Sequence, residues 1–238
     1  MHSFILMKCQ EFSGKRREKT LRRDGKKAII QGQNAPGQPE ARKNAGGIAL
    51  DQRFYDAVLA SPVIAAVKDM VQLEECLTLD NIQVVFLLFG DLCSIADIVA
   101  RAKDAGKIVM IHTDLVTGLS SSKEIVVDFL HTNTRADGII STKPNFIRRA
   151  RELKMFTVMR LFVIDSMALS GIDKLEAVRP DFIEVLPGVM PKTIRRITQT
   201  TRIPLLAGGL IADKEDVMAA LGAGAMAVSA TSREVWRM

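Results

Sequence analysis

The sequence predicts an α/β fold, a compact TIM-type barrel of eight β/α units with short helices, occupying residues 51–238. Eight short apolar runs follow one another in this part of the chain. They lack polar alternation, which is typical of strands covered on both faces. Helical patterns separate them, and this order favours a parallel sheet. Because the segment is shorter than most closed barrels, an open doubly wound sheet remains the competing architecture.

Each predicted strand is rich in Val, Ile, Leu or Phe and ends in a small, hydroxyl or charged residue. Such runs are short enough for buried strands of a single domain. The eight runs cover residues 61–69, 84–91, 107–114, 137–143, 156–166, 182–188, 203–209 and 225–232.

The helices between the runs are predicted from their amphipathic spacing and their end signals. Residues 91–105 place apolar side chains on one face and stop at Gly106. Other helix starts are marked by a capping box at Ser121 and Glu124, by Pro144 and Pro191, and by Asp213.

The cysteines and the hydropathy exclude several protein classes. Three cysteines without C-x-x-C spacing argue against a disulfide framework and against a zinc site. We expect Cys93, inside the helical pattern of 91–105, to be a small buried apolar residue. No apolar run approaches the 18 or so residues of a membrane span, and the opening residues do not resemble a secretory signal. We therefore expect a cytoplasmic protein without a membrane partner.

The positive charge of the chain belongs to its first fifty residues. The formal charge is +6, yet residues 1–50 hold 11 Lys and Arg against 4 Asp and Glu, a net of +7, and residues 51–238 have a net of −1. With few apolar positions, residues 1–50 are expected to be a flexible extension. A basic arm can hold RNA phosphates. The alternative, which we favour, is an extension without a specific role.

Two turns near the end of the chain offer donors to an anion. Gly208 and Gly209 follow the seventh apolar run, and Ser229, Thr231 and Ser232 end the eighth. In eight-unit barrels the loops after strands seven and eight commonly bind phosphate. We therefore predict that these five residues bind the phosphate of a small ligand. The alternative is that the glycines permit a tight turn and the hydroxyls cap a helix.

Charged residues at other strand ends are candidates for the rest of the ligand. Lys68 and Lys143 each follow an apolar run closely, Glu184 lies within one, and Asp114 ends another. Lysine binds phosphate as a point charge, and a carboxylate can accept from a ligand hydroxyl or pair with a lysine. Because barrel ligands bind where the strands end, we expect these four residues to face one mouth.

Other polar residues at strand ends have simpler interpretations. Asp91 and Asp165 occupy positions where Asp usually caps a helix. His112, a lone histidine in a strand, favours hydrogen-bonded packing over a ligand contact.

No metal-ligand cluster, nucleophile motif or GxGxxG is present, so we expect neither a metal nor a cofactor. An aldolase or isomerase acting through Lys68 or Lys143 remains the alternative to a binding protein.

Eight motifs in the same order give the chain a family resemblance. It resembles the glycerol uptake operon antiterminators, the glycerol-3-phosphate-responsive regulators of bacterial glycerol genes. The motifs are PVIAAVKD (62–69), VFLLFGD (85–91), HTDLVTGLS (112–120), DGIISTK (137–143), RLFVIDS (160–166), FIEVLPG (182–188), LLAGGLI (205–211) and GAMAVSATSREVW (224–236).

The resemblance implies a barrel that senses glycerol 3-phosphate and, when it is bound, binds the leader of a glycerol-gene messenger RNA and prevents termination. It implies a regulator of glycerol metabolism and not an enzyme. Two features depart from the family pattern. A hydroxyl residue is usual where Ala230 stands, and the basic extension has no counterpart, so no function transfers to it.

The candidates for RNA contact are basic residues, because the sequence shows no RNA-recognition motif. With one Trp and one Tyr, the chain lacks an aromatic-rich RNA-binding face. The near-neutral barrel leads us to expect that a homo-oligomer or the extension adds phosphate contacts. Basic residues of two predicted helices are the candidates, although each group can equally be a solvated outer face: Arg148, Arg149, Arg151 and Lys154 on one, and Lys192, Arg195 and Arg196 on the other.

Overall fold

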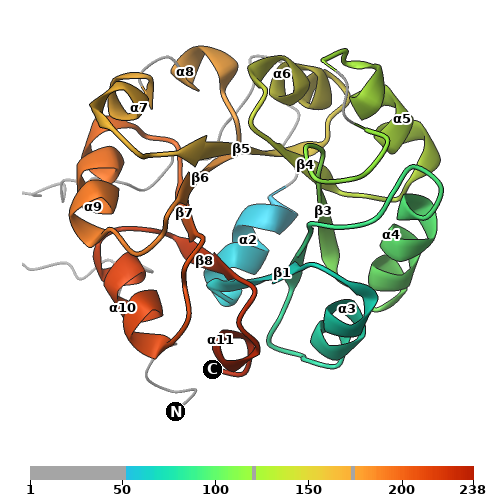
Figure 1. The fold of residues 1–238 in the computed structure, drawn as a ribbon, viewed down its shortest axis with the longest axis horizontal. Coiled ribbons are helices and arrows are strands. Elements are labelled where there is room, and N and C mark those ends of the chain that lie inside the picture. Colours follow the sequence, from blue (N-terminus) through green and yellow to red (C-terminus); the bar gives the residue numbers. More distant parts are fainter. Residues whose placement is uncertain (1–51, 120–121, 173–174) are drawn as a thin grey trace, which may run out of the picture. The chain divides into compact units, whose positions relative to one another are not determined.

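Eight parallel strands close into a barrel in sequence order, with β8 pairing to β1 (Figure 1). The computed structural model describes residues 52–119, 122–172 and 175–238. The closed ring confirms the predicted (β/α)8 fold and excludes the open sheet. The strands are β1 (Val63–Val67), β2 (Val84–Leu87), β3 (Ile108–His112), β4 (Gly138–Ser141), β5 (Phe156–Phe162), β6 (Phe182–Leu186), β7 (Leu205–Gly208) and β8 (Ala227–Ala230).

Helices lie outside the ring between successive strands, except α2, which overlies the centre of the ring in this view (Figure 1). Within the described residues, no helix has the length and apolar character needed to cross a membrane. The helices are α2 (Arg53–Ala60), α3 (Met70–Leu77), α4 (Ile95–Asp104), α5 (Ile125–Asn133), α6 (Pro144–Glu152), α7 (Ser166–Ser170), α8 (Leu175–Val178), α9 (Pro191–Thr200), α10 (Lys214–Gly222) and α11 (Arg233–Trp236).

Strand residues alternate between two apolar cores, because successive side chains of a strand point to opposite faces. Val63, Ala65 and Val67 of β1 join the outer core between strands and helices. Ile64 and Ala66 join the inner core of the barrel. Burial on both faces explains why these strands read as continuous apolar runs.

Helix α2 fills the amino-terminal end of the barrel, and the sequence analysis did not predict it. Phe54 is buried, and its ring centroid lies 4.7 Å from that of Phe182 and 5.5 Å from that of Phe156. Ala57 and Val58 belong to the same inner core. Phe54, Ala57 and Val58 have the i, i+3, i+4 spacing of one helix face, and this was the available signal.

The last residues of the chain reinforce the closure between β8 and β1. Trp236 is fully buried, and its Nε1 donates to the Ala230 carbonyl at 2.7 Å. Asn81, ahead of β2, donates to the Trp236 carbonyl at 2.8 Å. Arg233 and Arg237 both pair with Glu75 of α3.

Most of the predicted helix signals are confirmed. Pro144 and Pro191 stand at the first positions of α6 and α9. Asp213 and Asp165 cap α10 and α7 with their side chains. Gly106 follows α4 with a positive φ of 76°.

Two helix predictions near α4 and α5 had other outcomes. The prediction that Cys93 is buried is wrong: α4 begins only at Ile95, and Cys93 lies exposed in the turn before it. Asp91 accepts from the N–H groups of Cys93 and Ser94 in that turn. The capping box includes Ser121, which lies outside the described residues, as does the extension 1–50.

Candidate functional site

The barrel interior changes from apolar to polar toward the carboxyl ends of the strands. Inner-core residues on four strands are followed, two positions on and therefore on the same face, by a polar residue. The pairs are Met110 and His112, Val158 and Arg160, Phe182 and Glu184, and Ala227 and Ser229. All four polar side chains are buried, so the barrel has a polar floor below its carboxyl-terminal mouth.

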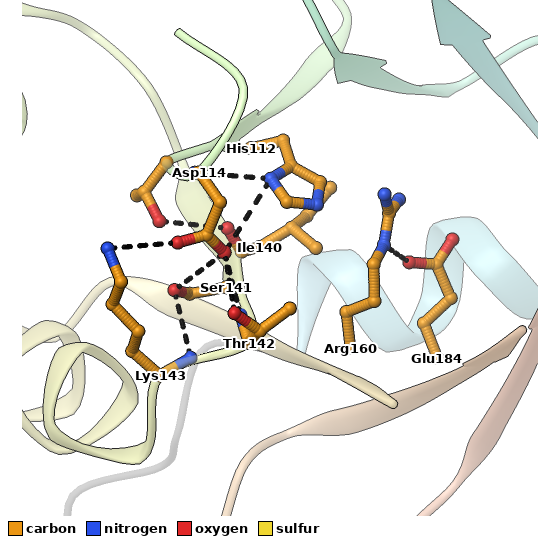
Figure 2. A network of polar contacts seen from close by, with 9 residues as sticks. His112, Asp114, Ile140, Ser141, Thr142, Lys143, Arg160 and Glu184 are labelled. Carbon is orange, nitrogen blue, oxygen red and sulfur yellow. Dashed lines mark hydrogen bonds and ion pairs between the residues drawn. The ribbon is translucent and has the colours of Figure 1, made fainter. Parts of the chain in front are cut away.

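A buried ion pair joins β5 to β6. Arg160 Nε donates to Glu184 Oε2 at 2.6 Å, and Ser229 Oγ donates to Glu184 Oε1 at 2.5 Å (Figure 2 shows the Arg160–Glu184 pair). Glu184 is fully buried. A buried carboxylate is tolerated when a cation and further hydrogen bonds satisfy it, as they do here. Glu184 was expected to face a ligand or a lysine, and it lies in the polar floor bound to an arginine and a serine.

Arg160 received no site role in the sequence analysis. Its position two residues after the inward-facing Val158 was the available signal.

Gly208 leaves room for this arrangement. A Cβ on Gly208 would lie 2.6 Å from both Glu184 Oε1 and Ser229 Oγ. The next residue, Gly209, has a positive φ of 73°, which favours glycine. Glycine is therefore favoured at the two positions for different reasons: limited space for a side chain at Gly208, and backbone conformation at Gly209.

A second polar cluster joins the ends of β3 and β4. The Lys143 ammonium lies 3.2 Å from Asp114 Oδ1. Asp114 Oδ2 accepts from the Thr142 N–H at 2.8 Å, from the Thr142 hydroxyl at 3.1 Å and from the Ser141 hydroxyl at 3.2 Å (Figure 2). Burial acts to raise the pKa of Asp114, but the Thr142 N–H and Lys143 outweigh it and hold this pKa below its ordinary value.

His112 stands between the two clusters as a neutral imidazole. Its side chain is 3% exposed, and burial, with the Arg160 charge nearby, lowers its pKa to about 3. The Asp114 N–H donates to His112 Nδ1 at 3.3 Å, so Nδ1 is the acceptor and the proton is on Nε2. No described residue accepts a hydrogen bond from Nε2.

The two turns predicted to bind phosphate are neighbours, because Gly208 of β7 pairs with Ser229 of β8. Among the described residues, none accepts from the N–H groups of Gly209, Leu210 and Thr231. The Ser232 hydroxyl donates to the Ala212 carbonyl and accepts from the Val235 N–H, so it caps α11.

Lys68 is exposed at the end of β1, the strand next to β8. It therefore lies next to the turn after β8, while the Lys143–Asp114 pair joins the ends of β3 and β4.

The residues predicted to contact RNA lie on two helices, α6 and α9, which α7 and α8 separate around the ring (Figure 1), except Lys154, which lies in the turn after α6. Arg149 pairs with Asp128 and with Glu152, so its charge is already partnered. The other basic residues of the two groups are exposed: Arg148, Arg151, Lys154, Lys192, Arg195 and Arg196.

A cavity of about 510 Å³ lies at the opposite end of the barrel, beside α2. Its lining carries both charge signs, including Arg53, Asp56, Asp80 and Lys107. The Lys107 ammonium is bound by the carbonyls of Leu79 and Ile82. This cavity lies away from the strand carboxyl ends, where the donor groups converge. In the part of the chain that the structure describes, no three His, Cys, Asp or Glu residues are grouped to hold a metal ion.

Comparison with known proteins decides the family. A family model described as "Glycerol-3-phosphate responsive antiterminator" matches residues 63–236. The chain belongs to this family. Membership confirms the resemblance drawn from the eight motifs, and the match leaves the basic extension outside the antiterminator region.

Individual relatives cover about three quarters of the chain. The curated "Uncharacterized protein YgcP" of Escherichia coli (strain K12) is 46% identical over 180 residues, 75% of this chain and 93% of YgcP. The glycerol uptake operon antiterminator regulatory protein of Listeria monocytogenes strain 4b F2365 is 37% identical, with a TM-score of 0.70 over 74% of this chain and 94% of that one. A glycerol uptake operon antiterminator-related protein of Thermotoga maritima MSB8 is 34% identical, with a TM-score of 0.65 over 75% of this chain and 99% of that one.

Proposed function

We propose that this protein binds glycerol 3-phosphate in the carboxyl-terminal mouth of its barrel and, in that state, binds the leader of a glycerol-gene messenger RNA and prevents termination. The ligand is an effector, and the proposal requires neither a cofactor nor catalysis. Its place of action would be the cytoplasm, where leader transcripts are made. Membership of the antiterminator family supports the effector and the regulatory role.

One observation carries the ligand half of the proposal. The turns after β7 and β8 lie side by side and present N–H groups that no described residue accepts from. Convergent N–H groups bind phosphate oxygens, and the same two loops serve this purpose in many eight-unit barrels. Gly208, Gly209, Ser229, Thr231 and Ser232 would surround the phosphate, mainly through their backbone, since the Ser229 and Ser232 hydroxyls already have partners.

The charged residues near the mouth fit an anionic ligand. Lys68 beside β8 would add a cation to the phosphate turns. The other predicted residues already form ion pairs, Lys143 with Asp114 and Glu184 with Arg160. Their proposed role is therefore to shape and polarise the part of the mouth that faces the rest of the ligand.

For RNA, we propose that the exposed basic residues of α6 and α9 supply phosphate contacts, with a homo-oligomer or the extension adding others. The described barrel is nearly neutral overall, so one copy offers few such contacts.

Calorimetry with glycerol 3-phosphate tests the ligand half, with glycerol and inorganic phosphate as controls. We expect one site per chain that binds glycerol 3-phosphate more tightly than either fragment. Filter binding of leader RNA with and without the ligand tests the regulatory half, and we expect tighter binding with it. Turnover of triose and glycerol phosphates would instead favour the aldolase or isomerase alternative, and the absence of ligand-dependent RNA binding would contradict antitermination.

A further inference from the structure

Two hydrogen-bond donors face each other in the polar floor, and neither has an acceptor among the described residues for the N–H groups that face the other. Figure 2 shows the Nε2 edge of His112 turned toward the Arg160 guanidinium. Arg160 is bonded through Nε alone, and no described residue accepts from its two terminal nitrogens. Nε2 of His112 carries a proton, because Nδ1 accepts from the Asp114 N–H. Neither group can satisfy the other, since both donate.

A buried donor without an acceptor costs free energy, so a native site that contains one calls for an explanation. His112 Nε2 is such a donor within the described residues. The nearby carboxylates do not accept from His112 Nε2, because they are bound by other groups. Glu184 is bound by Arg160 and Ser229, and Asp114 by Lys143 and the Thr142 N–H.

We propose that His112 and Arg160 bind an acceptor oxygen on the carbon chain of the ligand, and so determine which phosphate esters the site accepts. This inference rests on the proposed function, since it assigns the phosphate end to the turns after β7 and β8. The ligand class is then a short phosphate monoester that carries a hydroxyl or carbonyl oxygen. A ligand with an ammonium group in that place can only donate, and Arg160 repels it.

The positions of the strands support this division of the site. Arg160 and Glu184 lie on β5 and β6, and His112 on β3, whereas the donor turns follow β7 and β8. In a closed ring the two groups of residues line different parts of one mouth. A ligand held at one part by its phosphate can therefore present its carbon chain to the other.

The test compares three ligands in the wild-type protein and in three variants of the full-length chain. Calorimetry compares sn-glycerol 3-phosphate with propyl phosphate, which has the same carbon count and no chain oxygen. The wild-type protein should bind glycerol 3-phosphate more tightly, and 3-aminopropyl phosphate more weakly than either. His112→Phe should lower the affinity for glycerol 3-phosphate about 10-fold, as expected for one lost hydrogen bond, and leave propyl phosphate unchanged.

Two further variants complete the test. The first shows whether the loss of affinity comes from the missing donor or from the changed shape of the side chain, and the second is a control. In His112→Gln, the amide N–H replaces the Nε2 donor, so preference for glycerol 3-phosphate should return in part. His131→Phe, at an exposed position of α5, is the matched control and should resemble the wild type. Circular dichroism and thermal unfolding establish that each variant is folded.

The outcomes distinguish this inference from the proposed function. If the wild-type protein binds both phosphate esters equally well, or if His112→Phe weakens both equally, the assignment of His112 is wrong while the phosphate site stands. If the wild-type protein binds neither ester, the proposed function fails and this inference fails with it.

Discussion

The Glu184 carboxylate explains why the residue after Ala207 is glycine. Sequence reasoning gave Gly208 a role through its backbone, as a donor to phosphate. The structure adds a second reason, because the Glu184 and Ser229 side chains fill the space of a Cβ. A single residue can therefore connect the polar floor of the barrel with the turn above it.

Gly208→Ala should disturb this contact. The new methyl group displaces the Glu184–Ser229 pair, so we expect the free energy of unfolding to fall by about 1–3 kcal/mol. Urea denaturation measures this change. Gly222→Ala is the control, since a Cβ there meets nothing within 4 Å, and it should leave stability unchanged or raise it by up to about 1 kcal/mol. Equal stability of Gly208→Ala and the wild type would show that the pair relaxes freely.

His112 should make stability depend on pH. Its pKa is about 3 when folded, against an ordinary value of 6.5. The unfolded chain therefore binds a proton that the folded chain does not, and the stabilisation is complete above pH 6.5 and is lost as pH falls toward 3. The slope should approach about 1.4 kcal/mol per pH unit.

Urea denaturation between pH 7.5 and 5 measures the slope from His112, above the range where ordinary carboxylates titrate. His112→Gln should flatten this part of the curve, and His131→Gln should not. An unchanged slope in His112→Gln would assign the effect to other groups.

At the residue scale, composition and spacing identified strand-end charges and not their partners. Lys143 and Asp114 were both chosen, and their ion pair links two strands that only the folded ring brings together. Glu184 was assigned a role and its partner Arg160 was not, although both are charges within apolar runs. Strand parity gives the direction of a side chain, but the identity of its neighbour depends on the register between strands.

At the element scale, the eight strands could be predicted because both of their faces are buried. Uniform apolar runs between amphipathic helices are a strong pattern. Helix α2 was missed because it precedes the first strand and covers the amino-terminal end of the barrel, where a β/α repeat has no place for a helix. Between β5 and β6, the start of α7 was indicated by Asp165, whereas α8 was not predicted, since four residues carry little periodicity.

Helix α2 should contribute much of the barrel's stability. Phe54→Ala removes a ring that packs on Phe156 and Phe182, so we expect a loss of about 3–5 kcal/mol in the free energy of unfolding. Leu59→Ala, on the exposed side of the same helix, should cost within about 0.5 kcal/mol. Urea denaturation of both variants measures the difference. Similar losses would mean that the helix stabilises the barrel by its presence and not by its buried face.

At the scale of the whole molecule, the charge is divided between two parts of the chain. Residues 51–238 have a net charge of −1 and residues 1–50 a net charge of +7. The family match covers residues 63–236, within the nearly neutral part. If this chain binds RNA, the RNA phosphates are neutralised either by the extension or by the exposed basic residues of α6 and α9.

If the extension holds RNA phosphates, removal of residues 1–50 should weaken binding of leader RNA and reduce the dependence of this binding on salt. Each phosphate that a cation neutralises adds about 0.7 to the slope of log affinity against log salt for a single strand, so a shallower slope counts the contacts that are lost. Filter binding across a salt series measures both quantities, with glycerol 3-phosphate present throughout. A full-length chain with Lys15, Arg16 and Arg17 changed to Gln is the matched control, because it lowers the charge of the extension without shortening it. If the truncated chain keeps its affinity and slope, the extension has no part in binding, and the exposed arginines of α6 and α9 become the surface to change next.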